Sequence, residues 1–281
     1  MLMRDSLQAA FAAAVDDVAM SALSDMLGTL RQADDIDSAL LNASARINRL
    51  LGHAANGMLT GELRPEAGVL PLLEWNASDA ARVLLLLEAI AHPGVEPQRV
   101  VHAYFKGGDE SERAAVVRGL AMLPAPAEHH AVALEAGRIN SLRLYTALAL
   151  NNPYPAGFYS EHEFNQVVLK SLFTGLDIGR TVGLVRRANP ELSQMCRDYV
   201  EERENAERDV PHAIWLALAP HMDAAGERQL IRYLGDADAA HRYYTAVAAG
   251  RLATQSPALQ QAMQERRMQE GETDILAVLN D

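Results

Sequence analysis

The side chains best suited to hold a small molecule follow a proline-rich corner at residues 151–155. Placed about 100° apart on a helix, His162, Asn165 and Lys170 fall on one arc, which also carries a leucine and a phenylalanine. Because a face that only meets water seldom carries such residues, we expect this arc to be partly enclosed. An enclosed polar group needs a partner, since leaving it unsatisfied costs about 1–3 kcal/mol. The partner is either a neighbouring helix or a ligand.

Three arginines further along the chain could clamp an acidic ligand. Arg186, Arg187 and Arg203 each carry a planar guanidinium group, which matches the oxygens of a carboxylate or a phosphate. The alternative is that they form internal salt bridges with nearby carboxylates. The spacing also predicts i,i+4 ion pairs on one helix, at 197/201 and 204/208.

The motifs that announce common enzyme chemistry are absent from the sequence. It contains no glycine-rich phosphate-binding motif, no H-E-x-x-H and no G-x-S-x-G. His129 and His130 are adjacent, so their side chains diverge on a helix and cannot easily bind one metal ion. Cys196 lies on an apolar stripe and is expected to be buried and inert. We therefore expect no metal and no cofactor, and the alternative is an enzyme with an unrecognised site near residues 151–170, in which Lys170 acts as acid, base or electrostatic stabiliser.

Composition favours a helical protein that does not bind nucleic acid. Of 281 residues, 49% are hydrophobic but only 5% are aromatic, and alanine and leucine supply most of the apolar content. The formal net charge of −12 repels nucleic acid phosphates and anionic lipid head groups. No apolar run approaches the roughly 20 residues that span a bilayer, so we expect no integral membrane segment. A single cysteine suits a reducing compartment, and a cytoplasmic location is expected.

Apolar periodicity predicts an all-α chain of short helices. Similar helical segments begin at residues 78, 111 and 140, about 30 residues apart, which is typical of an α-solenoid of HEAT-like antiparallel helix pairs. An irregular helical bundle is the alternative. The last helix is expected to dock through Ile275, Leu276 and Leu279, or else to fray. The expected helices are 6–30, 36–52, 78–91 (capped by Ser78 and Asp79), 97–106, 127–136, 161–173, 190–206, 211–219, 225–234 and 239–249.

The proline-rich corner is expected to be a stiff change of direction. Pro153 and Pro155 should hold Asn152 and Tyr154 in extended conformations, so that the preceding helix cannot continue. No linker is long or polar enough to force a domain boundary. We therefore expect one all-helical domain over 1–281, with a possible subdivision into N-terminal helical repeats, 1–150, and a C-terminal core, 151–281.

The stretch 151–215 resembles the EboA family of bacterial metabolite traffic proteins. The resemblance rests on "NPYP", "FNQVVLKSLF", "GRTVGLVRRANPEL", "MCRDYVEERENAERDVP" and Trp215, whereas the N-terminal half is similar only in length and helical character. It implies a non-catalytic helical protein that helps to move or process a secondary-metabolite precursor. The implied partners are a small metabolite, or proteins of the same gene cluster for which the chain would act as a scaffold.

The candidate ligand-binding residues are those at which the resemblance and the physical interpretation coincide, together with His162 on the polar arc. They are Tyr154, His162, Asn165, Lys170, Arg186, Arg187, Asn189 and Arg203.

Overall fold

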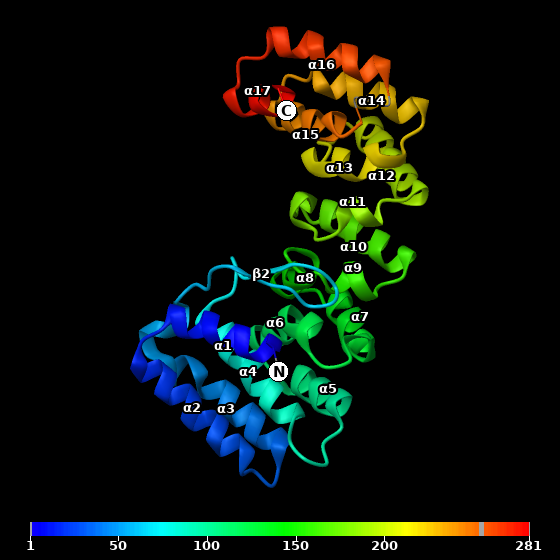
Figure 1. Ribbon diagram of the computed structural model, residues 1–281. Coiled ribbons are helices and arrows are strands. Elements are labelled where there is room, and N and C mark those ends of the chain that lie inside the picture. The colour runs from blue at the N-terminus through cyan, green and yellow to red at the C-terminus, as the bar shows by residue number, and fades with distance from the viewer. Residues whose placement is uncertain (1, 253–255, 281) are drawn as a thin grey trace. The chain divides into compact units, whose positions relative to one another are not determined.

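Helices form almost all of the regular structure of residues 2–252 and 256–280, which are the part of the chain described by the computed structural model (Figure 1). Within this part, the only strands are β1, Glu62–Leu63, and β2, Leu70–Pro71, which pair antiparallel. The predicted all-α class is confirmed. The helices vary in length from four to 16 residues, and a regular solenoid of repeats is not confirmed.

The contacts divide the chain after Ser160 into two compact units, which we describe separately. Whether they correspond to independent domains, as in the predicted subdivision at residue 150, stays a prediction. The helices of the N-terminal unit are α1 Leu2–Ala14, α2 Asp17–Arg31, α3 Ile36–Leu51, α4 Ala77–Ile90, α5 Pro97–Gly107, α6 Glu110–Gly119, α7 His130–Arg138, α8 Leu142–Ala149 and α9 Tyr154–Phe158, with short 3₁₀ helices η1 Gly52–Asn56, η2 Leu120–Met122 and η3 Pro126–His129.

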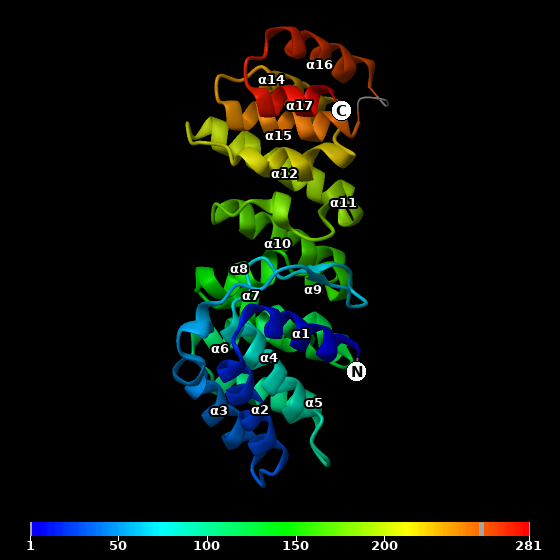
Figure 2. The ribbon, with the colours of Figure 1, turned by 60° about the vertical axis from the view of Figure 1, so that its left-hand side comes forward.

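Helix α4 is the centre of the N-terminal unit. Every residue of α4 is buried, because α1, α2, α3, α5 and α6 all pack against it (Figures 1 and 2). Its start differs from the prediction, since Asn76 caps the helix. Asn76 Oδ1 accepts the backbone N–H of Asp79 at 2.8 Å, and the Asp79 side chain accepts the backbone N–H of Asn76 at 3.5 Å.

One helix was predicted over 6–30, and the structure has two. The break falls at Asp16, whose carboxylate accepts the backbone N–H of Ala19 at 2.9 Å and so caps α2. A local cap of this kind contributes about 1 kcal/mol, which is enough to favour a break where both halves are amphipathic.

The corner at 151–155 is fixed by an asparagine side chain. Asn152 is buried, and its Nδ2 donates to the carbonyl oxygens of Val117, at 3.0 Å, and Ala147, at 2.9 Å. Its Oδ1 accepts the backbone N–H of Tyr154 at 3.0 Å. The prediction that the preceding helix stops here is confirmed, since α8 ends at Ala149.

The expected extended conformation of Tyr154 is wrong, because Tyr154 is the first residue of the short helix α9. Pro155 then occupies the second helical position, where its missing N–H costs no hydrogen bond. This short helix turns the chain after the corner.

Helix α9 lies directly against the loop that carries β1 and β2. A Cβ atom added at Gly157 would lie 2.6 Å from Ala67 Cβ and 3.0 Å from Ala67 Cα. We expect Gly157→Ala to lower the free energy of unfolding by about 1–3 kcal/mol, because the backbone of one segment must shift. Gly28→Ala, inside α2 with no atom within 4 Å, should instead stabilise by about 0.5–1 kcal/mol. Urea unfolding of both variants checks this, and equal midpoints would contradict the close approach.

The C-terminal unit begins with the helix predicted at 161–173, which has these bounds in the structure. One arc of this helix faces the core, since Phe164, Val167, Val168, Ser171 and Leu172 are all buried. The elements of this unit are α10 Glu161–Phe173, η4 Ile178–Arg180, α11 Leu184–Arg187, α12 Pro190–Asn205, η5 His212–Ile214, α13 Trp215–Leu218, η6 Ala219–His221, α14 Ala224–Leu234, α15 Ala239–Gly250, α16 Pro257–Gln269 and α17 Thr273–Asn280.

The last helix docks as expected. Ile275 and Leu279 of α17 are buried with Leu234 and Ala246 in one apolar cluster, and Leu276 is half-buried. Across residues 2–252 and 256–280, no helix combines the length and the hydrophobicity needed to cross a bilayer.

Candidate functional site

Two of the predicted site residues bind each other. Asn165 is fully buried, as its arc predicted, and its Nδ2 donates to Asn189 Oδ1 at 3.2 Å. In return, Asn189 Nδ2 donates to Asn165 Oδ1 at 2.9 Å. Asn189 is also the N-cap of α12, because its Oδ1 accepts the backbone N–H of Leu192 at 2.8 Å. These amides therefore fasten α10 to the start of α12 and leave little hydrogen-bonding capacity for a ligand.

The arginines after α10 have different surroundings. The guanidinium of Arg187 lies 4.9 Å from the centre of the Phe164 ring, and burial lowers its pKa, as does the charge of Arg186. Arg186 and His162 are exposed. None of these three side chains lines either of the two larger depressions described below.

The prediction of i,i+4 ion pairs at 197/201 and 204/208 is wrong. Arg197 pairs with Asp223 and Asp198, and Glu204 pairs with Arg232. Asp223 is the N-cap of α14, and Arg232 lies within α14. A contact with a neighbouring helix competes easily with an i,i+4 pair, which contributes only about 0.2–0.5 kcal/mol.

Tyr154 belongs to the N-terminal unit. Its hydroxyl donates to the carbonyl oxygen of Pro126 at 2.8 Å, and its ring packs on Phe158 and Tyr159. Burial raises the pKa of the phenol, so it stays protonated. Its role in the structure is to join α9 to the start of η3.

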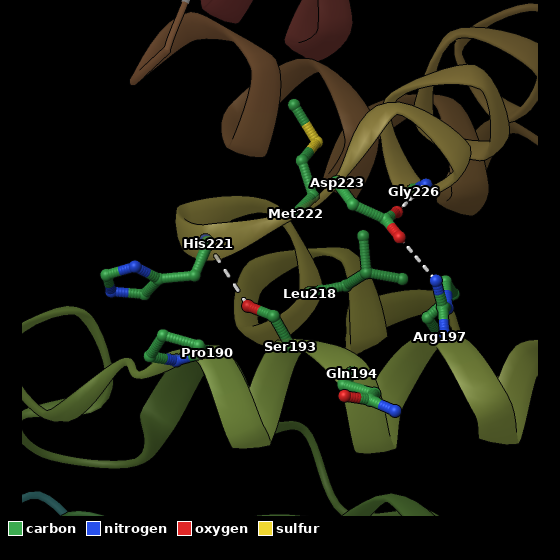
Figure 3. Close-up of a pocket in the computed structure, with 9 residues that line it drawn as sticks. All are labelled: Pro190, Ser193, Gln194, Arg197, Leu218, His221, Met222, Asp223 and Gly226. Carbon is green, nitrogen blue, oxygen red and sulfur yellow. Dashed lines mark hydrogen bonds and ion pairs between the residues drawn. The ribbon is translucent and has the colours of Figure 1, made fainter.

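A small pocket of about 190 Å³ lies between α12, η6 and the start of α14 (Figure 3). Ser193 Oγ accepts the backbone N–H of His221 at 3.2 Å, and Arg197 is paired with Asp223 across the pocket. Asp223 Oδ1 also caps α14 by accepting the N–H groups of Ala225 and Gly226. These polar groups hold two helices together, so we interpret the pocket as a structural joint.

A larger and more open depression lies between α10 and α12, and we name it the α10–α12 groove. It has a volume of about 550 Å³, and it places the predicted residue Lys170 beside apolar walls. Phe173 is 76% exposed at its end, which is unusual for a large aromatic side chain. The groove is lined by Gln166, Leu169, Lys170, Phe173, Met195, Asp198, Tyr199 and Glu202.

A second depression adjoins the groove, and we name it the polar hollow. It has a volume of about 680 Å³ and shares Phe173 and Tyr199 with the groove. It contains the predicted residue Arg203, whose Nε donates to the carbonyl oxygen of Asp209 at 2.8 Å. The other residues that line it are Leu172, Gly175, Arg208, Asp209, Val210, Pro211, His212, Tyr233, Asp236, Asp238 and His241.

A buried histidine forms part of the polar hollow. Trp215 Nε1 lies 3.1 Å from His241 Nδ1, and the indole N–H can only donate. His241 Nδ1 must therefore be the unprotonated nitrogen, and the proton of the neutral ring sits on Nε2. Burial lowers the pKa of His241, and the neighbouring His212 lowers it further, so the neutral form is favoured.

The aromatic rings around His241 form a continuous cluster. Its ring centre lies 4.5 Å from that of His212 and 4.6 Å from that of Tyr233, which in turn lies 4.4 Å from Trp215. His212 Nε2 is 2.9 Å from Asp238 Oδ2. The pKa of this carboxyl is lowered chiefly by the hydrogen bond from the backbone N–H of Ala240, and also by His212. The cluster gives the hollow a rigid aromatic floor with fixed hydrogen-bonding directions.

The sequence therefore located part of this site. Lys170 lies in the groove and Arg203 in the hollow, whereas His212, Tyr233 and His241 were missed. His212 directly follows Pro211, the last residue of the motif "MCRDYVEERENAERDVP", and this position could have indicated it. Tyr233 and His241 carry no such signal, because only the packing of α14 and α15 brings them here.

Cys196 is buried, as expected, and burial raises the pKa of its thiol to about 12. The thiol therefore stays protonated and inert. Within residues 2–252 and 256–280, no three His, Cys, Asp or Glu side chains are grouped as a metal site requires.

Comparison with known proteins places the chain in a family. The family model described as "Metabolite traffic protein EboA" matches residues 4–219. The match extends through the N-terminal half, where the sequence had indicated only a general similarity, and it stops before α14. No curated protein and no solved structure matches the chain. Because the matched region covers most of its length, the chain belongs to the EboA family of metabolite traffic proteins.

Proposed function

We propose that the protein takes part in metabolite traffic by binding a small metabolite in the polar hollow and the adjoining α10–α12 groove. The observation that carries the proposal is the continuity of the two depressions, which share Phe173 and Tyr199. One end offers apolar side chains and the other offers fixed polar groups on an aromatic floor, as small-molecule sites commonly do. The metabolite would lie with its apolar part against α10 and its polar part near α15.

We place this binding in the cytoplasm, because the only cysteine is an unpaired thiol, as is usual in a reducing compartment. The proposal assigns the protein a carrier role without turnover. What supports that role is the family description together with a site in which His241 Nδ1 accepts from Trp215 and His212 Nε2 lies against Asp238.

Phe173→Ser tests the proposal with little risk to the fold, since the side chain is largely exposed. We expect about tenfold weaker retention of the metabolite, because the ring loses the apolar area that a ligand would cover. The protein is purified from its native host, and the small molecules that copurify are measured by mass spectrometry. Val18→Ser is the matched control, since Val18 is 75% exposed and lies in the N-terminal unit.

The same two variants are then returned to a strain that lacks the protein. We expect Val18→Ser to restore the metabolite profile and Phe173→Ser to restore it only in part. Full restoration by Phe173→Ser, with unchanged copurification, would place the metabolite elsewhere or remove the binding role.

The exposure of Phe173 also favours a second function, the docking of a partner protein encoded in the same gene cluster. Leu169, Phe173 and Met195 line one open apolar groove, which a partner's helix could cover. In that case a pull-down recovers cluster proteins with the unaltered chain but not with Phe173→Ser, and no small molecule copurifies. Recovery of the same proteins with the unaltered chain and with Phe173→Ser would count against docking at this groove.

A further inference from the structure

We propose that the polar hollow recognises an oxyanion, carried by the metabolite as a carboxylate or a phosphate ester. This inference rests on the proposed binding function and names the chemistry that the hollow selects. It also assigns a role to residues of α14 and α15, which lie outside the region matched by the family model.

The first argument is the hydrogen-bond donor that His241 presents. Only 7% of this residue is exposed, and its Nδ1 is taken by Trp215. Its Nε2 carries the proton and has no hydrogen-bond partner among residues 2–252 and 256–280. Since His241 lines the hollow, this N–H can donate to a ligand oxygen there.

The second argument is that the carboxylates around the hollow are largely engaged. Asp238 Oδ1 accepts the backbone N–H of Ala240 at 2.8 Å, and its Oδ2 faces His212 at 2.9 Å. Asp236 Oδ1 accepts the backbone N–H of Asp238 at 2.8 Å. Asp209 remains as the carboxylate that these contacts do not occupy.

The arginines around the hollow are less engaged. Arg203 uses Nε on the carbonyl of Asp209 and stands 6.0 Å from the centre of the Tyr199 ring. In the described part of the chain, its terminal nitrogens and the guanidinium of Arg208 have no hydrogen-bond partner. The N–H groups of Arg203 and Arg208 that remain free can bind an acceptor with negative charge, beside the carboxylates of Asp209, Asp236 and Asp238.

Tyr233 completes the recognition surface from α14. Its hydroxyl donates to Glu204 at 2.7 Å, so its ring, and not its hydroxyl, is what it offers to a ligand. A planar apolar group next to the oxyanion would pack against Tyr233 and Tyr199. The ligand class is thus an amphiphilic organic anion whose charged end points toward Arg203, Arg208 and His241.

Two fluorescent probes separate the charge from the apolar body. 1-Anilinonaphthalene-8-sulfonate carries an oxyanion, and N-phenyl-1-naphthylamine has the same rings without it. In Arg203→Met/Arg208→Met we expect sulfonate binding to weaken by about ten- to a hundredfold, while binding of the neutral probe stays within twofold. The control Arg138→Met/Arg143→Met removes the same charge from exposed positions of the N-terminal unit and should change neither.

The thermal unfolding of both double variants is recorded first, so that a loss of sulfonate binding is read only on folded protein. Displacement of the sulfonate by benzoate, phenyl phosphate and benzyl alcohol then identifies the source of the oxyanion. We expect one of the two anions to displace it at tenfold lower concentration than the alcohol.

If Arg203→Met/Arg208→Met weakens the binding of both probes equally, or of neither, the oxyanion proposal is overturned. The proposed binding function is then still supported by binding of the neutral probe to the unaltered protein. Equal displacement by the alcohol and the anions also overturns it. If the unaltered protein binds neither probe, both the oxyanion proposal and the proposed site fall.

Discussion

Replacing Asn165 with alanine should lower the free energy of unfolding of the C-terminal unit by about 2–4 kcal/mol. The side chain is fully buried, and both of its amide atoms are bonded to Asn189. The alanine variant leaves Asn189 short of two partners and opens a small cavity, and each effect costs free energy. Because Asn189 caps α12, the start of that helix should loosen as well.

The two tryptophans allow this effect to be assigned to one unit. Trp75 lies in the N-terminal unit and Trp215 in the C-terminal unit, and both are buried. In a Trp75→Phe background, urea unfolding followed by fluorescence reports on Trp215. Gln166→Ala, at the exposed neighbouring position on α10, is the control and should stay within about 0.5 kcal/mol of the unaltered protein. An unchanged midpoint for Asn165→Ala would mean that the amide pair is not formed.

This prediction changes how Asn165 is to be used in a functional test. It was a candidate ligand residue because its arc looked enclosed, and the enclosure is real. Its partner, however, is a side chain 24 positions away. A loss of function in Asn165→Ala would therefore report a loosened unit, whereas Phe173→Ser acts on the groove through a largely exposed side chain.

Features that depend on residues close together in the sequence could be predicted. The end of the helix before the corner follows from proline geometry, and the enclosure of Asn165 follows from helical period. The break at Asp16 could also have been anticipated, because an aspartate that caps a helix competes with continuation through it.

Tertiary packing decided the rest. Arg197 pairs with Asp223 instead of Glu201, and His241 meets Trp215 across 26 positions, because α14 and α15 pack near α12 and α13. An exposed i,i+4 pair is worth too little to resist such a contact. The residues that give the hollow its polarity thus come from distant segments, and no spacing along the chain reveals them.

The four last helices matter to this site although the family model ends before them. Arg242 follows His241 on α15, and its guanidinium binds Glu270, the residue that follows α16. Glu270 also accepts hydrogen bonds from Arg266 Nε at 2.9 Å and from the N–H groups of Gly271 and Glu272. One carboxylate therefore ties the helix that carries His241 to the end of the chain.

Glu270→Gln should lower the free energy of unfolding of the C-terminal unit by about 2–4 kcal/mol at pH 7, because it leaves two largely buried arginines without their counter-charge. The hydrogen bond from Arg242 is the main cause that holds the pKa of Glu270 at about 2, below its ordinary 4.5. Since the folded pKa is the lower one, this stabilisation is complete above about pH 5 and is lost as the pH falls from 4.5 toward 2.

Urea unfolding of Glu270→Gln at pH 7 and at pH 3 measures both effects. The difference in unfolding free energy between the variant and the unaltered protein should be smaller at pH 3. Glu265→Gln removes an exposed carboxylate from α16, the helix that Glu270 follows, so its effect on the free energy of unfolding should be small at both pH values. An equal difference in unfolding free energy at pH 7 and at pH 3 would contradict a stabilising role of the ion pairs of Glu270. Because α15 carries both Arg242 and His241, the same variant should also weaken sulfonate binding in the hollow, which would tie the anchoring of the chain's end to the polarity of the site.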